Sequence, residues 1–419
     1  MNRHNISYAL VGRTEGYPEN IGSDIDIVIS RNGISDFKRV IWEMEDADTK
    51  IVSMFQHEIV AFYYVVFHFD GDKRIFIQPD VCTDYYRKGR LFLTADFLLD
   101  GRRKAPQGDF YVLSPAKEFI YYLLKKIDKQ SLSSEQFEHL RRVYLHDKSA
   151  AIQEASTFWN ATDLSIIQEA LEKNRCELIL DRLKQLQQVI HASHYIRPMD
   201  LAKNCFLKMK RILHPTGFVL AVMGPDGSGK STFLQQFEKD IQPAFRRMQR
   251  FHLFPVPEKG NAVVVSNPHE LKPRGAFLSL CKLCYYLALY RCGHLRYVLP
   301  KKIRSTLTIY DRYFDDIVID PVRYRNGTST WVVRLFCRFI PRPDQWFFLD
   351  CPTEVIQARK AEVTPEETER QRQAYLNLAH ERKNSVVLDT NRNVEEISIE
   401  ACRAMCELLS QRARKRYRK

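Results

Sequence analysis

The sequence lacks a long uninterrupted apolar segment. Its most apolar stretch, residues 276–289, contains Lys282 and falls short of the roughly 20 residues that span a bilayer. The first residues lead directly into a short apolar run, Tyr8–Val11, without the pattern of a signal peptide. We therefore expect no membrane span and a cytoplasmic location, and we interpret 276–289 as a buried or amphipathic helix.

Clustered cysteines are also scarce. The 10 cysteines are scattered, and only Cys281/Cys284 and Cys402/Cys406 form close pairs. A structural zinc site usually takes four ligands from two such clusters, and neither pair has a matching second one. The sequence predicts reduced core thiols, without disulfides or a structural metal.

Acidic residues are outnumbered, because 64 Lys and Arg against 51 Asp and Glu give a net charge of +13. This excess favours anionic partners such as nucleotides, phosphorylated sugars, nucleic acid or a membrane face. Residues 411–419 form a concentrated basic tail that is either solvated or in contact with a membrane surface or RNA. Apolar residues make up 45% of the chain, which indicates packed domains rather than disorder.

Length and periodicity predict an α/β protein with three domains, since 419 residues exceed a single typical core. Residues 1–112 alternate short strand-like runs (8–11, 25–29, 59–69, 74–77) with helical stretches. Residues 113–212 have helical periodicity, which includes 161–172 and 179–189. Residues 213–419 contain four apolar runs (218–223, 307–310, 345–349, 385–388) separated by helical patterns, which predicts a doubly wound parallel sheet.

A glycine-rich phosphate-binding loop follows the first of these runs. The segment matches G-x-x-x-x-G-K-[ST] in full and reads Gly224, Pro225, Asp226, Gly227, Ser228, Gly229, Lys230, Ser231 and Thr232. Glycines allow consecutive backbone amides to turn toward an anion at the positive end of a helix. We expect Lys230 to reach the β- and γ-phosphates of ATP and the Ser231 hydroxyl to bind Mg²⁺.

Asp226 is unusual inside a phosphate loop, and we expect it to face the phosphate acceptor. Together with Tyr310-Asp311-Arg312-Tyr313, it makes the sequence resemble the thymidylate kinase group of nucleoside-monophosphate kinases. The resemblance implies that Asp226 contacts the acceptor, that Asp311 aids Mg²⁺ or the acceptor, and that Arg312 binds the acceptor phosphate. It also implies a lid at 359–372, whose candidates for clamping the transferred charge are Arg359, Lys360, Arg370 and Arg372.

The substrate motif of that group is missing, which argues against thymidylate as the acceptor. In place of F-x-R-E-P-G-G the chain has 251–257, followed by Asn267-Pro268-His269. Residues 311–325 fit D-R-Y-x-x-D-x-x-x-D-P-x-R-Y-R. This stretch is similar to thymidylate-kinase-like proteins of bacterial polysaccharide gene clusters, and the resemblance implies polysaccharide biosynthesis without naming the acceptor.

Three carboxylates near the N-terminus form a second candidate site. Asp24 and Asp26 are two apart on an expected strand, so their side chains share one face, and Asp80 on a neighbouring strand would complete a cluster for Mg²⁺. With Gly12 and the Gly22-Ser23 lead-in, they resemble the nucleotidyltransferase superfamily of the polymerase-β kind. That superfamily has Gly-Ser where this chain has Gly12-Arg13, so activity of this domain stays open.

Two functions follow from these residues. The first is a kinase that depends on ATP and Mg²⁺, phosphorylates a small phosphorylated acceptor such as a nucleotide or sugar phosphate, and carries a nucleotidyltransferase-like domain. The alternative is a nucleotide-gated regulatory or nucleic-acid-binding protein that phosphorylates no acceptor; nucleic acid is the less favoured partner. The sequence leaves open whether the chain forms a homodimer.

Overall fold

The computed structural model describes residues 1–22, 24–71, 73–256 and 273–417. The chain forms two compact units. Unit 1 comprises Met1–His68 and Ile75–Lys210, and unit 2 comprises Phe69–Arg74 and Arg211–Lys419. Each unit is considered by itself. Helix α9 (Pro198–Leu213) contains the boundary between the two units in the sequence.

Unit 1 is built on a mixed sheet of seven strands in the order β3-β4-β5-β2-β1-β9-β8. The strands are β1 (Tyr8–Val11), β2 (Asp24–Ile29), β3 (Thr49–Glu58), β4 (Ala61–Asp70), β5 (Lys73–Cys82), β8 (Arg103–Lys104) and β9 (Tyr111–Val112). A separate ribbon pairs β6 (Tyr85–Arg87) with β7 (Arg90–Leu93). Strand β3 was not predicted, because polar residues interrupt its alternating pattern.

Two of the described α-helices of unit 1 lie between strands in the sequence, and the others follow the last strand, β9. They are α1 (Gly33–Glu43), α2 (Ala95–Leu99), α3 (Pro115–Lys129), α4 (Ser134–His146), α5 (Lys148–Ala155), α6 (Ala161–Glu172), α7 (Glu177–Leu180) and α8 (Leu183–Ser193). One core joins them to the strands, because Ala9 and Val28 pack in the same cluster as Phe119 and Leu123 of α3. Residues 113–210 therefore belong to the compact unit of the N-terminal sheet, where we predicted a separate domain. The helix expected over 179–189 is interrupted between α7 and α8.

Unit 2 has a five-stranded parallel sheet in the order β11-β12-β10-β13-β14. The strands are β10 (Phe218–Met223), β11 (Arg247–Phe251), β12 (Thr306–Asp311), β13 (Gln345–Asp350) and β14 (Ser385–Asp389). The four apolar runs predicted as strands are confirmed. Strand β11 was not predicted. It lies at the edge of the sheet and is mostly polar, with the sequence Arg247-Met248-Gln249-Arg250-Phe251.

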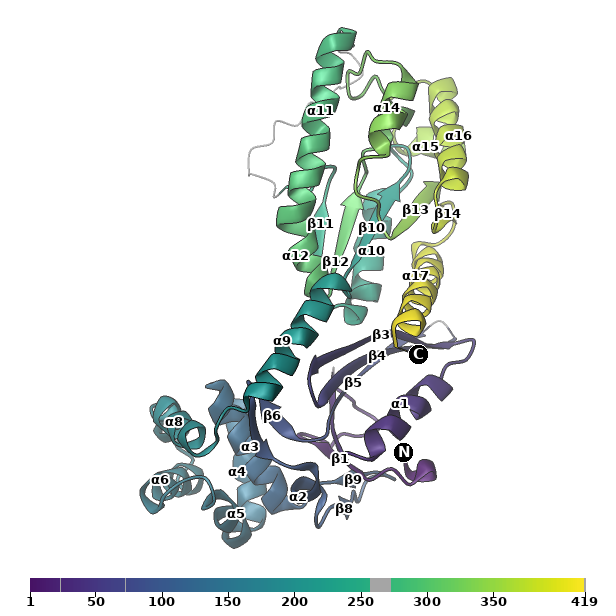
Figure 1. Cartoon of the computed structure of the whole chain (residues 1–419). Helices are drawn as coiled ribbons and strands as arrows, with labels where there is room; N and C mark the ends of the chain where they lie inside the picture. Colours follow the sequence, from purple (N-terminus) through teal and green to yellow (C-terminus); the bar gives the residue numbers. More distant parts are fainter. Residues whose placement is uncertain (23, 72, 257–272, 418–419) are drawn as a thin grey trace. The chain divides into compact units, whose positions relative to one another are not determined.

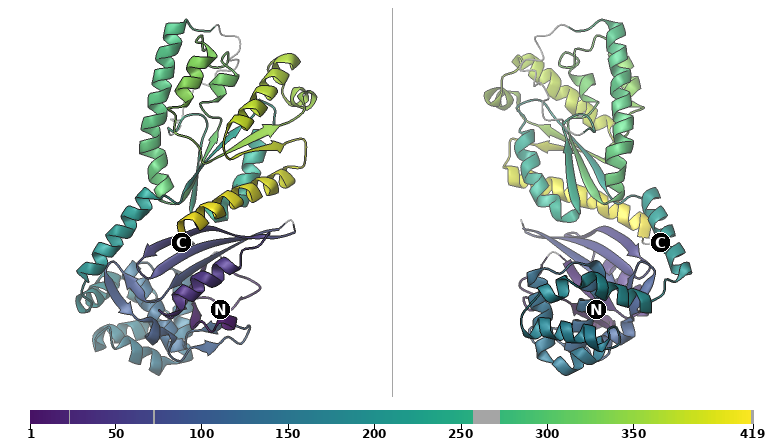
Figure 2. Two further views of the ribbon diagram at one scale, coloured as in Figure 1. Left: turned by 45° about the vertical axis from the view of Figure 1, so that its right-hand side comes forward. Right: turned by 90° about the vertical axis from the view of Figure 1, so that its left-hand side faces the viewer.

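Helices cover both faces of this sheet, with α10 (Lys230–Ile241) and α17 (Val394–Tyr417) on one face and α11 (Ala276–Gly293) on the other (Figures 1 and 2). The others are α12 (Leu299–Ile303), α13 (Asp316–Ile319), α14 (Thr330–Cys337), α15 (Thr353–Arg359) and α16 (Pro365–Glu381). Among the described helices, none is both long enough and apolar enough to cross a membrane.

Helix α11 differs from the prediction of a buried or amphipathic helix. Leu283 and Tyr290 are buried against the core, but the opposite face is also apolar and exposed: Phe277 is 76% and Tyr285 60% exposed. Cys281 and Cys284 are likewise exposed, whereas Cys402 and Cys406 are buried as predicted. All 10 cysteines are free thiols.

The described part of the basic tail is not a solvated extension. Residues 411–417 form the last turns of α17, and Arg412 donates to the carbonyl oxygens of Thr216 (2.6 Å) and Gly217 (2.9 Å). Arg416 donates to the carbonyl of Pro215 at 3.0 Å. Part of the basic charge of the tail therefore binds the segment before β10, and residues 418–419 lie outside the described part of the chain.

Candidate active site

The glycine-rich loop connects the carboxyl end of β10 to the first turn of α10. Strand β10 is buried along its whole length between β12 and β13, so the loop opens at the carboxyl edge of the sheet. Gly227 and Gly229 have φ angles of +84° and +81°, and a Cβ on Gly227 would lie 3.0 Å from the carbonyl oxygen of Ile356. Both the backbone conformation and the close approach therefore require glycine.

The side chain of Lys230 is buried inside the loop. Its ammonium group donates to the carbonyl oxygens of Gly224 (2.8 Å) and Pro225 (2.7 Å), and lies 3.7 Å from Asp226. Burial and the nearby Arg312 lower the pKa of Lys230 to about 8, although Asp226 acts in the opposite direction. The loop thus holds one cation close to the backbone of its first residues.

The carboxylate of Asp226 accepts hydrogen bonds from two guanidinium groups, those of Arg312 and Arg323. Burial alone would raise the pKa of Asp226, but Arg312, Lys230 and Arg323 lower it below its usual range. The prediction that Asp226 faces the acceptor remains a prediction. The structure shows where the carboxylate points, namely toward the arginines of the 312–323 segment.

Arg312 is the centre of a buried polar network. It is 4% exposed, follows β12 with φ +77°, and its amide donates to the carbonyl of Val222 at 3.0 Å. Its guanidinium also donates to Asp316 at 2.8 Å, and Asp316 accepts further bonds from the hydroxyls of Tyr324 (2.7 Å) and Tyr375. Positive φ in an arginine is strained, so the surrounding contacts hold this residue in place.

The carboxylate of Asp311 lies at the end of β12, opposite Val222 of β10. Its Oδ2 is 3.6 Å from Arg250 and 3.9 Å from the Nδ1 of His252, whereas Oδ1 is buried and accepts no hydrogen bond. Burial opposes ionisation, but His252, Lys230 and Arg250 lower the pKa of Asp311 overall. An ionised carboxylate with an unused buried oxygen can take a cation or a donor.

The predicted lid residues have different surroundings. Arg359 lies beside the loop, since a Cβ on Gly229 would be 3.7 Å from its Nη1, and it donates to the carbonyl of Thr390 at 3.4 Å. The other three are paired with carboxylates: Arg370 with Glu367 (2.7 Å), Arg372 with Asp350 (2.7 Å) and Lys360 with Glu362 (2.6 Å). Arg359 therefore lies next to the phosphate loop without a carboxylate partner among the described residues, and Lys360 is also beside the loop, since a Cβ on Gly227 would be 3.3 Å from its Cβ.

Two residues of this network received no role from the sequence. Arg323 and Asp316 were only positions of the motif that fits residues 311–325. The spacing of Arg312 and Asp316, four residues apart with Tyr324 further on, is a signal that could have suggested an ion pair. The contact of Tyr375 comes from α16 and depends on the fold.

The residues of the loop fit a nucleotide phosphate and its metal ion. The hydroxyl of Ser228 is fully buried and has no hydrogen-bond partner, and Oδ1 of Asp311 is in the same condition. Buried polar atoms without partners are rare in proteins and commonly mark a binding site. Ser231 and Thr232 are exposed on the first turn of α10, where a ligand of the loop can be reached.

The N-terminal carboxylates lie on neighbouring strands, as Asp26 of β2 is the register partner of Asp80 on β5. Lys125 of α3 forms an ion pair with Asp26 at 3.0 Å, and Tyr63 donates to Asp24 at 3.2 Å. Burial and Asp26 raise the pKa of Asp80 to about 6. Within the described ranges, no group of three or more His, Cys, Asp or Glu side chains could hold a metal ion. Lys125 neutralises Asp26 in this arrangement, and the Mg²⁺ cluster of Asp24, Asp26 and Asp80 remains a prediction.

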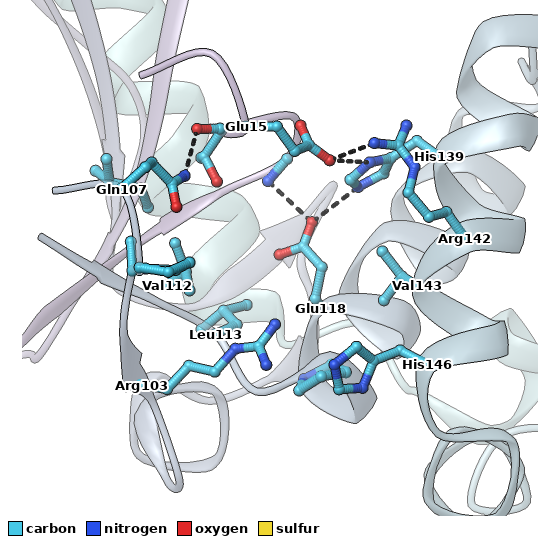
Figure 3. A pocket seen from close by; sticks show the side chains of 16 residues that line it. Glu15, Arg103, Gln107, Val112, Leu113, Glu118, His139, Arg142, Val143 and His146 are labelled. Atoms are coloured by element: carbon cyan, nitrogen blue, oxygen red, sulfur yellow. Dashed lines mark hydrogen bonds and ion pairs between the residues drawn. The ribbon is translucent and has the colours of Figure 1, made fainter. Parts of the chain in front are cut away.

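An open cavity of about 230 Å³ adjoins Gly12. The amide of Gly12 donates to Glu118 at 2.9 Å, and the same oxygen of Glu118 lies 3.2 Å from Nε2 of His139. Glu15 faces His139 and forms an ion pair with Arg142 at 2.6 Å (Figure 3). The Gly12 amide is therefore already occupied by a carboxylate. Ser23, also part of the predicted nucleotidyltransferase motif, lies outside the described residues, as does Asn267-Pro268-His269.

The family model of thymidylate kinase matches residues 222–401. The match begins at the end of β10 and includes the phosphate loop, Asp311-Arg312, the lid segment and the first third of α17. It supports a nucleotide-kinase-like phosphotransferase domain in unit 2, on a parallel sheet consistent with a P-loop kinase. This part of the chain is similar to thymidylate kinases.

Proposed function

We propose that unit 2 transfers a phosphoryl group from ATP, with Mg²⁺, to a small acceptor that already carries a phosphate. The proposal is supported by two features that lie side by side at one edge of the sheet. One is the phosphate loop around Lys230, and the other is the carboxylate of Asp226 held by Arg312 and Arg323. The first group suits a nucleotide triphosphate, and the second suits a polar, anionic acceptor beside it.

The donor side uses the backbone of the loop. Amides between Gly224 and Thr232 bind phosphate oxygens at the start of α10, and Lys230 neutralises charge on the transferred group. Ser231 and Asp311 hold the metal ion, which when bound supplies charge stabilisation at the phosphate oxygens. Arg359, next to Gly229, neutralises charge that develops during transfer, and Arg370 joins it only if its pair with Glu367 opens.

The acceptor side uses the arginines that now bind Asp226. Arg312 or Arg323 binds the acceptor phosphate, because a guanidinium offers two parallel donors to such a group. Once the arginines release Asp226, its carboxylate accepts a hydrogen bond from a hydroxyl group of the substrate. A nucleotide or a sugar phosphate satisfies both requirements, and the likeness of 311–325 to proteins of polysaccharide gene clusters favours a sugar phosphate.

For unit 1 we propose a nucleotidyltransferase-like domain. The support is the placement of Asp26 opposite Asp80 on adjacent parallel strands, directly beside the turn at Gly12. Two contacts oppose catalysis in this arrangement, namely the Lys125–Asp26 ion pair and the bond from the Gly12 amide to Glu118. Metal binding here requires that Lys125 move away from Asp26.

The test of the kinase proposal is ADP release from ATP by the full chain with a panel of nucleotides and sugar phosphates. Lys230→Ala should abolish release, while Lys239→Ala, an exposed lysine on the same helix, should leave it unchanged. A specific acceptor disproves the purely regulatory alternative. Equal turnover by the Lys230→Ala variant and the wild type contradicts the kinase proposal. RNA binding with a steep salt dependence and no acceptor would favour the alternative.

A further inference from the structure

Three cationic residues lie close together at the segment that contains Arg323. Lys282 of α11 donates to the carbonyl of Tyr324 at 2.7 Å. The amide of Arg274 donates to the carbonyl of Arg325 at 3.2 Å, which ties the residues before α11 to the same segment. Lys282, Arg274 and Arg325 thus come from two separate parts of the chain, which one side-chain and one main-chain hydrogen bond hold together. We call them the cation cluster.

The charges of the cation cluster repel one another. Burial lowers the pKa of Lys282 to about 8, and the nearby charges of Arg274 and Arg325 contribute to this shift. Arg325 also has a φ angle of +50°, a strained conformation for a side chain of its size. Such strain and repulsion persist where the surroundings enforce them, and they are typical of ligand sites.

The cation cluster is continuous with the proposed acceptor site. In the segment 323–325, Arg323 binds Asp226 of the phosphate loop, and the hydroxyl of Tyr324 binds Asp316. Arg325 lies two residues beyond Arg323, a span of at most about 7 Å. Beside the cluster, the rings of Tyr286 and Phe254 lie 4.6 Å apart, and Lys282 is 5.2 Å from the Tyr286 ring. Both rings are only partly buried, so they offer an aromatic surface beside Lys282.

We propose that the acceptor carries a second anionic group, and that Lys282 and Arg274 bind this group while Arg312 and Arg323 bind the first. The inference rests on the proposed function of unit 2, and it narrows the acceptor to a dianionic class such as a bisphosphate or a phosphate that also bears a carboxylate. An anion in the cation cluster relieves its repulsion. A second anionic group would also account for the additional cation, Arg325, that follows Arg323 in the segment 321–325.

The experiment compares matched ligands by calorimetry on the full chain with a non-hydrolysable ATP analogue. The pairs are glucose 1-phosphate against glucose 1,6-bisphosphate, and adenosine 5′-phosphate against adenosine 3′,5′-bisphosphate. In at least one pair the bisphosphate should bind roughly tenfold more tightly, the effect of one good charge-assisted contact. Lys282→Met should remove this preference and leave the affinity for the ATP analogue unchanged. Arg296→Gln, an exposed cation further along the chain, is the control and should keep the preference.

The outcomes separate this inference from the kinase proposal. If neither pair shows a preference, or if the Lys282→Met variant keeps it, the second anionic site is refuted even when phosphoryl transfer occurs. If the preference exists and depends on Lys282 but no ligand is phosphorylated, the site stands and the kinase proposal falls. Circular dichroism of each variant checks that the fold is retained.

Discussion

The buried network around Arg312 allows a quantitative test of the structure. In an Arg312→Met variant the side chain keeps its length and loses its charge. Asp316, which is fully buried, then keeps only its bonds from Tyr324 and Tyr375. Removing one partner of a buried ion pair costs about 3–5 kcal/mol. Because two tyrosine hydroxyls still donate to Asp316, we expect unit 2 to lose about 3 kcal/mol of unfolding free energy.

The loss should depend on pH in a defined direction. In the wild type, burial would raise the pKa of Asp316, but Arg312 and the two tyrosine hydroxyls lower it overall. Without Arg312 the pKa of Asp316 rises above its unfolded value, so the folded variant prefers the protonated acid. The variant is then least destabilised at low pH. Its loss of unfolding free energy relative to the wild type grows as the pH rises through the raised pKa of Asp316.

The assay is urea unfolding at pH 5 and pH 8, with the transition of unit 2 identified as the one that ATP shifts to higher urea. Arg334→Met, which removes an exposed pair with Glu381, is the control and should cost under about 1 kcal/mol. A deficit for Arg312→Met that is equally small, or one that is larger at pH 5 than at pH 8, would refute the assigned network.

Three further predictions concern the two sites. Because the pKa of Lys230 is lowered to about 8, the ATP affinity should fall as the pH rises above 8, by up to about tenfold per pH unit, and titration of ATP binding between pH 7 and 9.5 measures this. Lys125→Met should free Asp26 and raise the Mn²⁺ affinity of unit 1, measured by electron paramagnetic resonance; an unchanged affinity would show that Lys125 does not block the carboxylates. Gly227→Ala places a Cβ 3.0 Å from the carbonyl of Ile356 at φ +84° and should weaken ATP binding at least tenfold, whereas Gly275→Ala, with open space around it, should not.

The fold of unit 2 could be predicted from the sequence because its strands are apolar on both faces. β10, β12 and β13 read as continuous runs of buried residues, and each was located within one residue. The edge strand β11 carries Arg247 and Arg250 and does not have this signature. In unit 1 the division between strands and helices was visible, but the shared core of α3 with the strands depends on tertiary packing that no local pattern contains.

For the candidate site, the sequence indicated the residue types and not their partners. The phosphate loop was recognisable from its spacing, because the chemistry needs glycines, a lysine and a hydroxyl in fixed positions. The pairing of Asp226 with Arg323, 97 residues away, follows from the path of the chain between β12 and α14. The pairing of Lys125 with Asp26 is also a long-range contact, and it changes the interpretation of the N-terminal carboxylates.

The ion pairs of Asp226 connect the stability of unit 2 to its proposed chemistry. A carboxylate beside a triphosphate is unfavourable unless cations neutralise it, and Arg312, Arg323 and Lys230 do so in the structure. In the proposed function, an acceptor phosphate would compete with Asp226 for the same guanidinium groups, so its binding would exchange one anionic partner for another at little electrostatic cost. The released Asp226 then needs a donor, and an acceptor hydroxyl supplies it. A ligand with the phosphate but without the hydroxyl leaves Asp226 unpaired near the donor phosphates, which explains physically why an aspartate at this position can discriminate among anionic ligands.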